Sequence, residues 1–316
     1  MLRNKIEMGS TLRGRLLLWI HVIAAILIAP ALLPANDLSG EAENKPQSLW
    51  EIEPDLVVPE IETGESLAIP GAGRRVRHQL EPGSWSQTEV YHTLYLPVNW
   101  QPGKKYPVLV EFPGNGPYKN KLGDVCTGFV DDCRLGYGIS AGRDFIWICL
   151  PFVSEDRHHN QRQWWGNPKA TVEYCREAVS MVCRDWGGDE SNILLCGFSR
   201  GAIACSYIGL RDEKIARLWK GFICHSHFDG VRKWPYPDSD PESALKRLKL
   251  LNNRPVFISH ELDTTATREF LTDNHVEGNF QFLPLPYPNH TDAWVLRDIP
   301  ERSKLRLWLH QVIHKN

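Results

Sequence analysis

The sequence predicts an α/β fold with a mostly parallel central sheet and helices on both of its faces. The first observation is a series of short, solidly apolar runs, at 108–112, 145–150, 192–197, 221–224 and 255–259. Strands with one wet face alternate apolar and polar residues, whereas strands covered on both faces do not. The second observation is that segments with helical spacing separate these runs. Buried strands alternating with helices are typical of a parallel sheet.

The remaining elements follow from the same patterns. Two edge strands are expected ahead of the parallel series, at 76–80 and 89–96, and one more strand after it, at 280–285. A helix is expected over 170–186, because its apolar residues recur at helical spacing and a Gly-Gly pair follows it. The last helix is expected over 301–314, with leucines placed for packing on the sheet.

The 316 residues are enough for one large domain behind an N-terminal leader. Basic residues near the start precede an uncharged apolar run over 16–33 that contains small residues suited to cleavage. We therefore expect a signal peptide over 1–35 and a periplasmic or extracellular location, with an uncleaved membrane anchor as the alternative. Residues 36–75 are acidic and contain proline, which predicts a linker or peripheral arm. The folded domain is expected over 76–316.

Composition argues against several classes of partner and cofactor. The formal net charge is −2 and basic clusters are absent, which argues against nucleic acid. No phosphate-cradling glycine-rich loop is present, so no cofactor is expected. His225 and His227 alternate along an extended segment without a third ligand at useful spacing, so no metal is expected. No segment after the leader resembles a membrane span, and the oligomeric state stays open.

The eight cysteines leave the disulfide pattern open. Cys175 and Cys183 lie on the expected helix, about 12 Å apart by helical rise, which is too far for one bridge. The cysteines on the expected core strands are predicted to be buried thiols. Cys126 and Cys133 flank a short polar loop, where either a local disulfide or two free thiols fits the pattern.

The pentapeptide Gly-Phe-Ser-Arg-Gly at 197–201 lies between an apolar strand and a small-residue helical start. At a sharp strand-to-helix turn a serine is held exposed, and the flanking glycines let strand and helix approach closely. A serine hydroxyl is a weak nucleophile and needs a general base that is itself oriented by an acid. Ser199 is therefore the expected nucleophile.

The base and the acid are expected downstream, each after a strand of the sheet. His290 lies in a polar loop after the strand at 280–285 and is the expected base. Asp263 lies beyond the strand at 255–259 and is the preferred acid. Glu261, two residues earlier, and Asp229, after the strand at 221–224, are the alternatives. The resulting order along the chain is serine, acid, histidine.

The developing oxyanion needs backbone N–H donors in place before reaction. Arg200 follows the nucleophile and is expected to supply the first N–H. The second should come from the loop after the strand at 108–112, where Pro113 has no N–H to give. Asn115 or Gly114 is therefore the expected second donor.

With these residues in this order, the sequence resembles the serine α/β-hydrolase superfamily, most nearly its secreted feruloyl, acetylxylan and polyhydroxyalkanoate-depolymerase-like esterases. The resemblance spans residue 76 to the C-terminus and implies an α/β-hydrolase catalytic domain that cleaves carboxylic esters through an acyl-enzyme. Arg200 directly after the nucleophile is also similar to glucuronoyl esterases, in which such an arginine assists the oxyanion, although their longer motif is not matched. A structural ion pair is the alternative role for this side chain.

Aromatic residues near the expected site bear on the substrate. Trp164, Trp165 and Trp234 are expected to wall a cleft for a sugar ring or a phenolic acyl group, the alternative being a place in the core. The expected partner is a small or polysaccharide-linked ester. Two other functions stay open: an exported serine peptidase of the prolyl-oligopeptidase type, and a non-catalytic binding module that keeps the fold.

Overall fold

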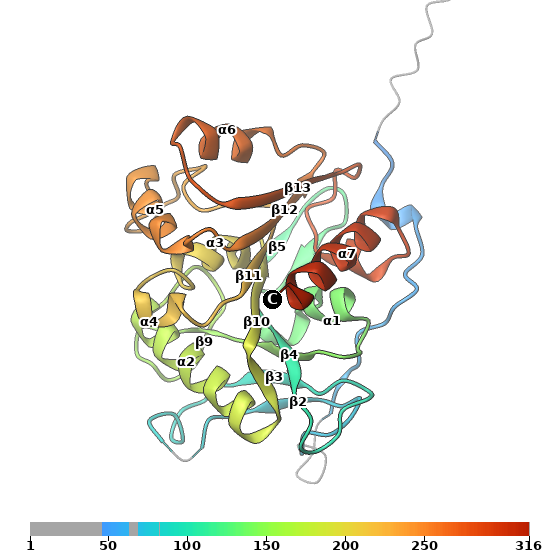
Figure 1. Ribbon diagram of the computed structural model, residues 1–316, viewed down its shortest axis with the longest axis vertical. Helices are drawn as coiled ribbons and strands as arrows, with labels where there is room; N and C mark the ends of the chain where they lie inside the picture. The colour runs from blue at the N-terminus through green and yellow to red at the C-terminus, as the bar shows by residue number, and fades with distance from the viewer. Residues whose placement is uncertain (1–45, 63–68, 82, 316) are drawn as a thin grey trace, which may run out of the picture. The chain divides into compact units, whose positions relative to one another are not determined.

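A nine-stranded sheet organises the part of the chain that this computed structural model describes, residues 46–62, 69–81 and 83–315 (Figure 1). Across the sheet the strands follow the order β1 (Ile61–Glu62), β2 (Arg75–His78), β3 (His92–Tyr95), β7 (Ile146–Cys149), β4 (Tyr106–Phe112), β10 (Gly188–Phe198), β11 (Gly221–His225), β12 (Pro255–Glu261) and β13 (Asn279–Leu285). Every neighbouring pair from β7 to β13 is parallel, whereas β3 is antiparallel to both of its neighbours. The predicted, mostly parallel sheet is confirmed.

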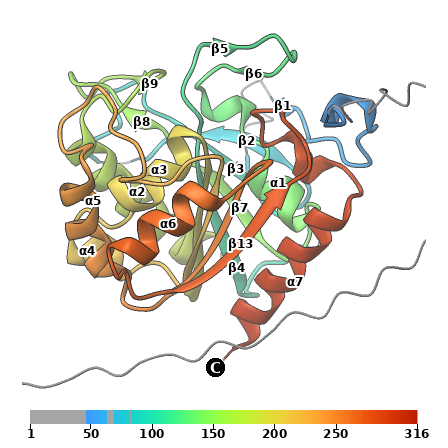
Figure 2. The ribbon, with the colours of Figure 1, turned by 90° about the horizontal axis from the view of Figure 1, so that it is seen from above.

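Helices cover both faces of this sheet (Figure 2). On one face α2 (Pro168–Asp185) and α3 (Arg200–Tyr207) share an apolar core with the strands, and on the other face α1 (Leu135–Ser140) and α7 (Pro300–His314) share a second one. The remaining elements are α4 (Glu213–Ala216), α5 (Pro241–Leu248), α6 (Thr265–Asp273), the ribbons β5–β6 (Tyr118–Lys119, Val125–Cys126) and β8–β9 (Phe152–Val153, Asn160–Gln161), and the 3-10 turns η1 (Leu49–Glu51), η2 (Val130–Asp132), η3 (Lys249–Leu251) and η4 (Ala293–Leu296). In the described part of the chain, no helix is both long and apolar enough to cross a membrane.

The apolar runs are continuous because successive strand residues enter opposite cores. On β4, Val108 and Val110 belong to the core under α2 and α3, whereas Leu109 belongs to the core under α1 and α7. All three are 0% exposed. Each such side chain contributes roughly 1.5–3 kcal/mol relative to an exposed position. A polar residue at any of these three positions would lose part of this stabilisation. Apolar and polar residues therefore do not alternate along this run.

Capping residues fix both ends of helix α2. The side chain of Asn167 accepts a hydrogen bond from the N–H of Ala170, and Pro168 occupies the first helical position, where its missing N–H is not needed. After Trp186 the backbone of Gly187 adopts a positive φ of 77°, which ends the helix. The helix expected over 170–186 is therefore confirmed.

The segment expected over 36–75 to be a linker or a peripheral arm packs as an arm in its described part, residues 46–62 and 69–75. These described residues belong to the same compact unit as the rest of the domain, and β1 within this segment pairs with β2. Buried C-terminal arginines satisfy the carbonyls and a carboxylate of the arm: Arg297 donates to the carbonyl of Ile52 at 2.7 Å, and Arg302 pairs with Asp55 at 2.6 Å. Figure 1 shows this blue segment beside the start of α7. The signal peptide expected over 1–35 lies outside the described residues.

The eight cysteines are all free thiols. Cys126 is half-buried and Cys133 is buried, and they are not joined, so the local disulfide considered for this pair is absent. Burial raises the pKa of the Cys126 thiol to about 11, which keeps it protonated near neutral pH. The thiols on the core strands behave as small apolar side chains, as expected.

Candidate active site

Ser199 occupies a strained turn between β10 and α3. Its backbone has φ 54° and ψ −114°, a conformation that non-glycine residues rarely adopt. The flanking glycines make the turn possible, because a Cβ at Gly197 would lie 2.2 Å from the backbone of Gly201, and a Cβ at Gly201 would lie 2.0 Å from the carbonyl oxygen of Phe112. The N–H of Ser199 donates to the carbonyl of His225 at 2.9 Å. The strand-turn-helix setting predicted for Ser199 is thus observed.

His290 reaches Ser199 from the loop after β13. Its Nε2 lies 3.2 Å from Oγ of Ser199. The two residues meet because β10, β12 and β13 are parallel, so that their carboxyl ends open at the same edge of the sheet. The imidazole keeps 21% of its surface exposed, which leaves it open to a ligand. A hydroxyl–imidazole contact of this kind is what a serine nucleophile needs from a general base.

Glu261, and not Asp263, lies at the far side of this imidazole, which corrects the preferred acid. Oε1 of Glu261 is 2.9 Å from Nδ1 of His290. Asp263 is exposed, and its carboxylate accepts hydrogen bonds from the N–H and the hydroxyl of Thr265 at the start of α6. The reason is that β12 continues to Glu261, paired with Leu285, before Leu262 turns the chain with φ 58°.

The other alternative, Asp229, belongs to a separate buried network. Its carboxylate accepts hydrogen bonds from Nε of Arg247 and from the hydroxyl of Ser206, both at 2.8 Å. Asp229 is therefore not the partner of His290.

The surroundings of Glu261 favour its ionised form. Burial alone would raise the pKa of Glu261, but the hydrogen bond from His290 and the neighbouring imidazoles of His225 and His290 hold this pKa well below its usual range. Glu261 is therefore an ionised partner for a protonated imidazole.

Ser226 is a member of the site that sequence reasoning missed. Its hydroxyl hydrogen-bonds to the carboxylate of Glu261, and its oxygen lies 2.8 Å from Nδ1 of His290. The backbone of Ser226 has φ 81°, a second strained position at the same edge of the sheet. The sequence offers no signal for it beyond its place directly after β11.

The loop after β4 lies against the turn at Ser199. A Cβ at Gly114 would lie 2.7 Å from Sγ of Cys126 and 3.0 Å from the ring of Phe198, so only glycine fits there without displacement. The side chain of Asn115 accepts a hydrogen bond from the N–H of Trp164 at 2.7 Å, which fixes the loop. The N–H of Arg200 stands at the first residue of α3, where helix N–H groups have no intrahelical acceptor.

The guanidinium of Arg200 holds together the loops around the site. It donates to the carbonyls of Trp164 at 2.6 Å, Gly114 at 2.8 Å and Gly128 at 3.3 Å, and it stacks 4.1 Å from the ring centroid of Phe152. None of its contacts within the described residues is with a carboxylate, so the ion-pair alternative is wrong. Burial without a counter-charge lowers the pKa of Arg200 to about 9.

A row of aromatic rings leads away from His290. The ring centroid of His227 lies 5.3 Å from that of His290 and 5.2 Å from that of Trp234, which in turn lies 5.6 Å from Trp164. Trp164 and Trp234 are partly exposed. Trp165 is only 4% exposed and packs into the apolar core, so it does not line a cleft as expected.

The histidine pair after β11 divides between the core and the site. His225 is buried, with its ring nitrogens 3.0 Å from the hydroxyl of Ser259 and 2.9 Å from the carbonyl of Thr291. Burial lowers the pKa of both His225 and His227 to about 4. Both rings are therefore neutral near pH 7.

One group of potential metal ligands was not anticipated. Glu111, Cys133 and Cys149 cluster in the buried interior of the described chain. The carboxylate of Glu111 already accepts hydrogen bonds from the N–H groups of Leu135 and Gly136 and from the indole of Trp147. Both carboxylate oxygens therefore already accept hydrogen bonds, and these join the start of α1 to the sheet.

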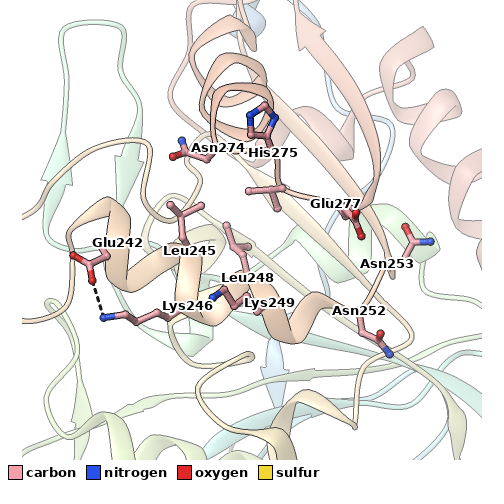
Figure 3. Close-up of a pocket in the computed structure, with 11 residues that line it drawn as sticks. Glu242, Leu245, Lys246, Leu248, Lys249, Asn252, Asn253, Asn274, His275 and Glu277 are labelled. Atoms are coloured by element: carbon pink, nitrogen blue, oxygen red, sulfur yellow. Dashed lines mark ion pairs between the residues drawn. The ribbon is translucent and has the colours of Figure 1, made fainter.

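A surface hollow of about 660 Å³ lies elsewhere, between α5 and the loop after α6 (Figure 3). Its walls carry the exposed ion pair of Glu242 and Lys246 at 2.9 Å, together with His275 and several asparagines. It shares no residue with the Ser199 site. Its volume is therefore not evidence about the chemistry at Ser199.

Comparisons with known proteins give fold similarity at low sequence identity. No model of a known protein family matches the sequence, and no curated protein matches it significantly. A Bacteroides ovatus structure named as a dipeptidyl aminopeptidase IV is similar with a TM-score of 0.50 and 18% identity, over 75% of this chain and 35% of its own. A thermostable esterase has a TM-score of 0.49 at 12% identity, over 75% and 62% of the two chains. A feruloyl esterase module from Clostridium thermocellum, in complex with sinapinate, has a TM-score of 0.48 at 13% identity, over 84% and 98%.

This chain thus spans less than two thirds of the first two structures that it matches. At 18% identity, the similarity to the Bacteroides ovatus structure is a similarity of fold alone. The sheet order and the turn at Ser199 agree with that likeness. The chain therefore has the α/β-hydrolase fold.

Proposed function

We propose that this protein is a serine hydrolase that cleaves carboxylic esters through an acyl-enzyme. The observation that carries the proposal is the continuous chain of contacts from Ser199 to His290 at 3.2 Å and from His290 to Glu261 at 2.9 Å. A serine hydroxyl is activated by a general base within hydrogen-bond reach that is itself oriented by a carboxylate, and these contacts supply both.

In the proposed mechanism Oγ of Ser199 attacks the ester carbonyl while Nε2 of His290 takes its proton. Glu261 accepts the Nδ1–H and stabilises the imidazolium that forms. The oxyanion binds to the N–H of Arg200 and to that of Asn115 or Gly114. His290 then returns the proton to the leaving alcohol, and a water molecule, activated by the same imidazole, releases the acyl group from Ser199.

Supporting residues keep this arrangement in place. The guanidinium of Arg200 serves the reaction indirectly, because it holds the carbonyls of Trp164 and of Gly114, and Gly114 lies in the loop proposed to supply the second oxyanion donor. Trp164 and Trp234 are proposed to contact the alcohol part of the ester, which is the leaving group. The expected class of substrate is polysaccharide-linked esters. Replacing Trp234 by alanine should raise KM for an acetylated xylan oligomer more than for p-nitrophenyl acetate. An equal change for both substrates would count against this contact.

Export from the cytoplasm is also a proposal, and it depends on residues 1–35 alone. It is tested by expressing the full chain and sequencing the N-terminus of the protein recovered outside the cytoplasm. Recovery of the intact N-terminus in the membrane fraction would instead favour the anchor.

The central experiment is covalent labelling of the purified protein with a fluorophosphonate, combined with hydrolysis of p-nitrophenyl acetate. The reagent should modify Ser199, and Ser199→Ala should lose both labelling and nearly all turnover. Ser86→Ala removes an exposed serine hydroxyl that only contacts the carbonyl of Gly83, and it should change neither. Absence of labelling in the unmodified protein would favour a non-catalytic binding module.

A peptidase is the second candidate, favoured by the fold similarity to the Bacteroides ovatus structure. The same serine chemistry would then cleave an amide bond. An aminoacyl-prolyl p-nitroanilide distinguishes the two, since an esterase should leave it intact at enzyme concentrations that exhaust p-nitrophenyl acetate.

A further inference from the structure

We propose that Asp124 and the N-terminal arm at Trp50 form a clamp that positions His290 for catalysis. The clamp consists of Asp124, Trp50, Leu49 and Asn289. The inference rests on the proposed function, because it assigns a role to residues that act through His290. None of these residues touches Ser199 in the described contacts, and the arm precedes His290 by about 240 residues.

Asp124 is the centre of the clamp. Its carboxylate lies between β5 and β6, is 0% exposed, and accepts the backbone N–H of His290 at 2.8 Å. It also accepts the amide of Asn289 at 2.8 Å, the indole N–H of Trp50 at 2.9 Å and the amide of Asn120 at 2.6 Å. A buried carboxylate is costly unless its oxygens are satisfied, and here four neutral donors satisfy it.

The arm closes the network from the other side. The N–H of Leu49 donates to the side-chain oxygen of Asn289 at 2.7 Å, so Asn289 is held by Leu49 and by Asp124 at the same time. Leu49 is itself buried, and its carbonyl accepts a hydrogen bond from Arg297 at 3.1 Å. The loop that carries His290 is therefore fixed between the β5–β6 ribbon and the arm.

The same ribbon also contacts the imidazole. Tyr118 on β5 packs edge-on against the ring of His290, with ring centroids 5.2 Å apart. Thus the backbone N–H of His290 is held by Asp124, its ring by Tyr118, and its Nδ1 by Glu261. A displacement of about 1 Å at a catalytic group costs on the order of 10²-fold in rate. With Nε2 already 3.2 Å from Ser199, loosening the clamp should lengthen the contact through which the proton moves.

Two variants of the full chain test the clamp. Asp124→Asn keeps the shape of the side chain but presents an amide N–H₂ to donors that need an acceptor. Trp50→Phe removes the indole N–H and narrows the ring, but leaves an aromatic ring for the stacked Arg297, at a residue that is 38% exposed, so the fold should tolerate it. Both should lower kcat for p-nitrophenyl acetate about tenfold or more, with KM within about twofold, and should slow fluorophosphonate labelling of Ser199 in parallel.

Trp100→Phe is the matched control, because it removes an indole hydrogen bond to the carbonyl of Trp186, remote from His290. It should leave kcat and labelling unchanged. Unaltered kcat in Trp50→Phe would overturn the clamp, as would a loss of activity that only follows a loss of folded protein by circular dichroism. If Asp124→Asn does not fold, Trp50→Phe decides. If the unmodified protein fails to react with the fluorophosphonate, the proposed function itself is wrong, which is a different outcome from failure of the clamp.

Discussion

Glu261 lies 2.9 Å from Nδ1 of His290, whereas Asp263, only two residues further along the chain, bonds to Thr265 at the start of α6. The carboxylate that orients the imidazole therefore ends a strand, and the neighbouring carboxylate begins a helix. Each carboxylate can therefore be replaced by its amide separately, with the length of the loop unchanged.

Replacing Glu261 by glutamine should lower kcat for p-nitrophenyl acetate by a factor on the order of 10²–10⁴, because the amide cannot stabilise the imidazolium. The matched variant Asp263→Asn should keep kcat within about twofold, since its carboxylate is exposed and hydrogen-bonds to Thr265 and not to His290. Steady-state kinetics on both proteins decides the assignment. A severe loss in Asp263→Asn with full activity in Glu261→Gln would reverse it.

Ser226 should contribute through its hydroxyl and not through its backbone. Ser226→Ala and Ser226→Gly both remove the hydrogen bond to Glu261, but only glycine relieves the positive φ at this position. Both variants should lose kcat to a similar extent, roughly tenfold for one hydrogen bond to a charged group. Thermal unfolding should show the glycine variant to be the more stable of the two. Unequal kcat values would point to a backbone effect.

The guanidinium of Arg200 should matter for the rate without contacting substrate. Arg200→Lys keeps a positive charge but cannot donate to the carbonyls of Trp164, Gly114 and Gly128 together. We expect a loss of stability on the order of 2 kcal/mol and a fall in kcat with little change in KM. Chemical denaturation and kinetics on the same preparation measure both. Arg211→Lys, at a partly exposed residue that stacks on Tyr207, is the control and should change neither.

Acid should destabilise the protein through its buried histidines. Burial lowers the pKa of His225 from 6.5 to about 4, so between these values the unfolded chain binds a proton that the folded chain does not. Stability contributed by neutral His225 is complete above pH 6.5 and falls by about 3 kcal/mol as the pH drops to 4. His225→Gln should flatten this part of the stability profile, measured by urea unfolding at several pH values. His310→Gln, an exposed residue on α7, should leave the slope unaltered.

Local patterns were sufficient for the frame of the molecule. The continuous apolar run of β4 indicates a strand that is buried on both faces. The glycines at 197 and 201 indicate the turn at Ser199, because a Cβ at either position would clash with the backbone. His290 could be identified because a polar loop follows its strand. These features depend on residues that are neighbours in the chain.

The features that could not be predicted depend on pairing across the fold. The choice of Glu261 over Asp263 depends on how far β12 continues beside β13, which the length of an apolar run does not reveal. Asp124 meets Trp50 and His290 only after the chain has folded, so no spacing marks it. Trp165 and Trp164 are adjacent in sequence, but only Trp164 remains partly exposed.

The absence of a side chain at Gly201 restricts how this protein can be redesigned. The first turn of α3 rests directly on the backbone of Phe112, and even alanine would force β4 and the loop after it away from the helix. Libraries that aim to change selectivity should therefore hold position 201 constant and diversify the partly exposed surface around Trp234. Directed evolution that accepts a substitution at 201 would have to rebuild the entire entrance to the serine.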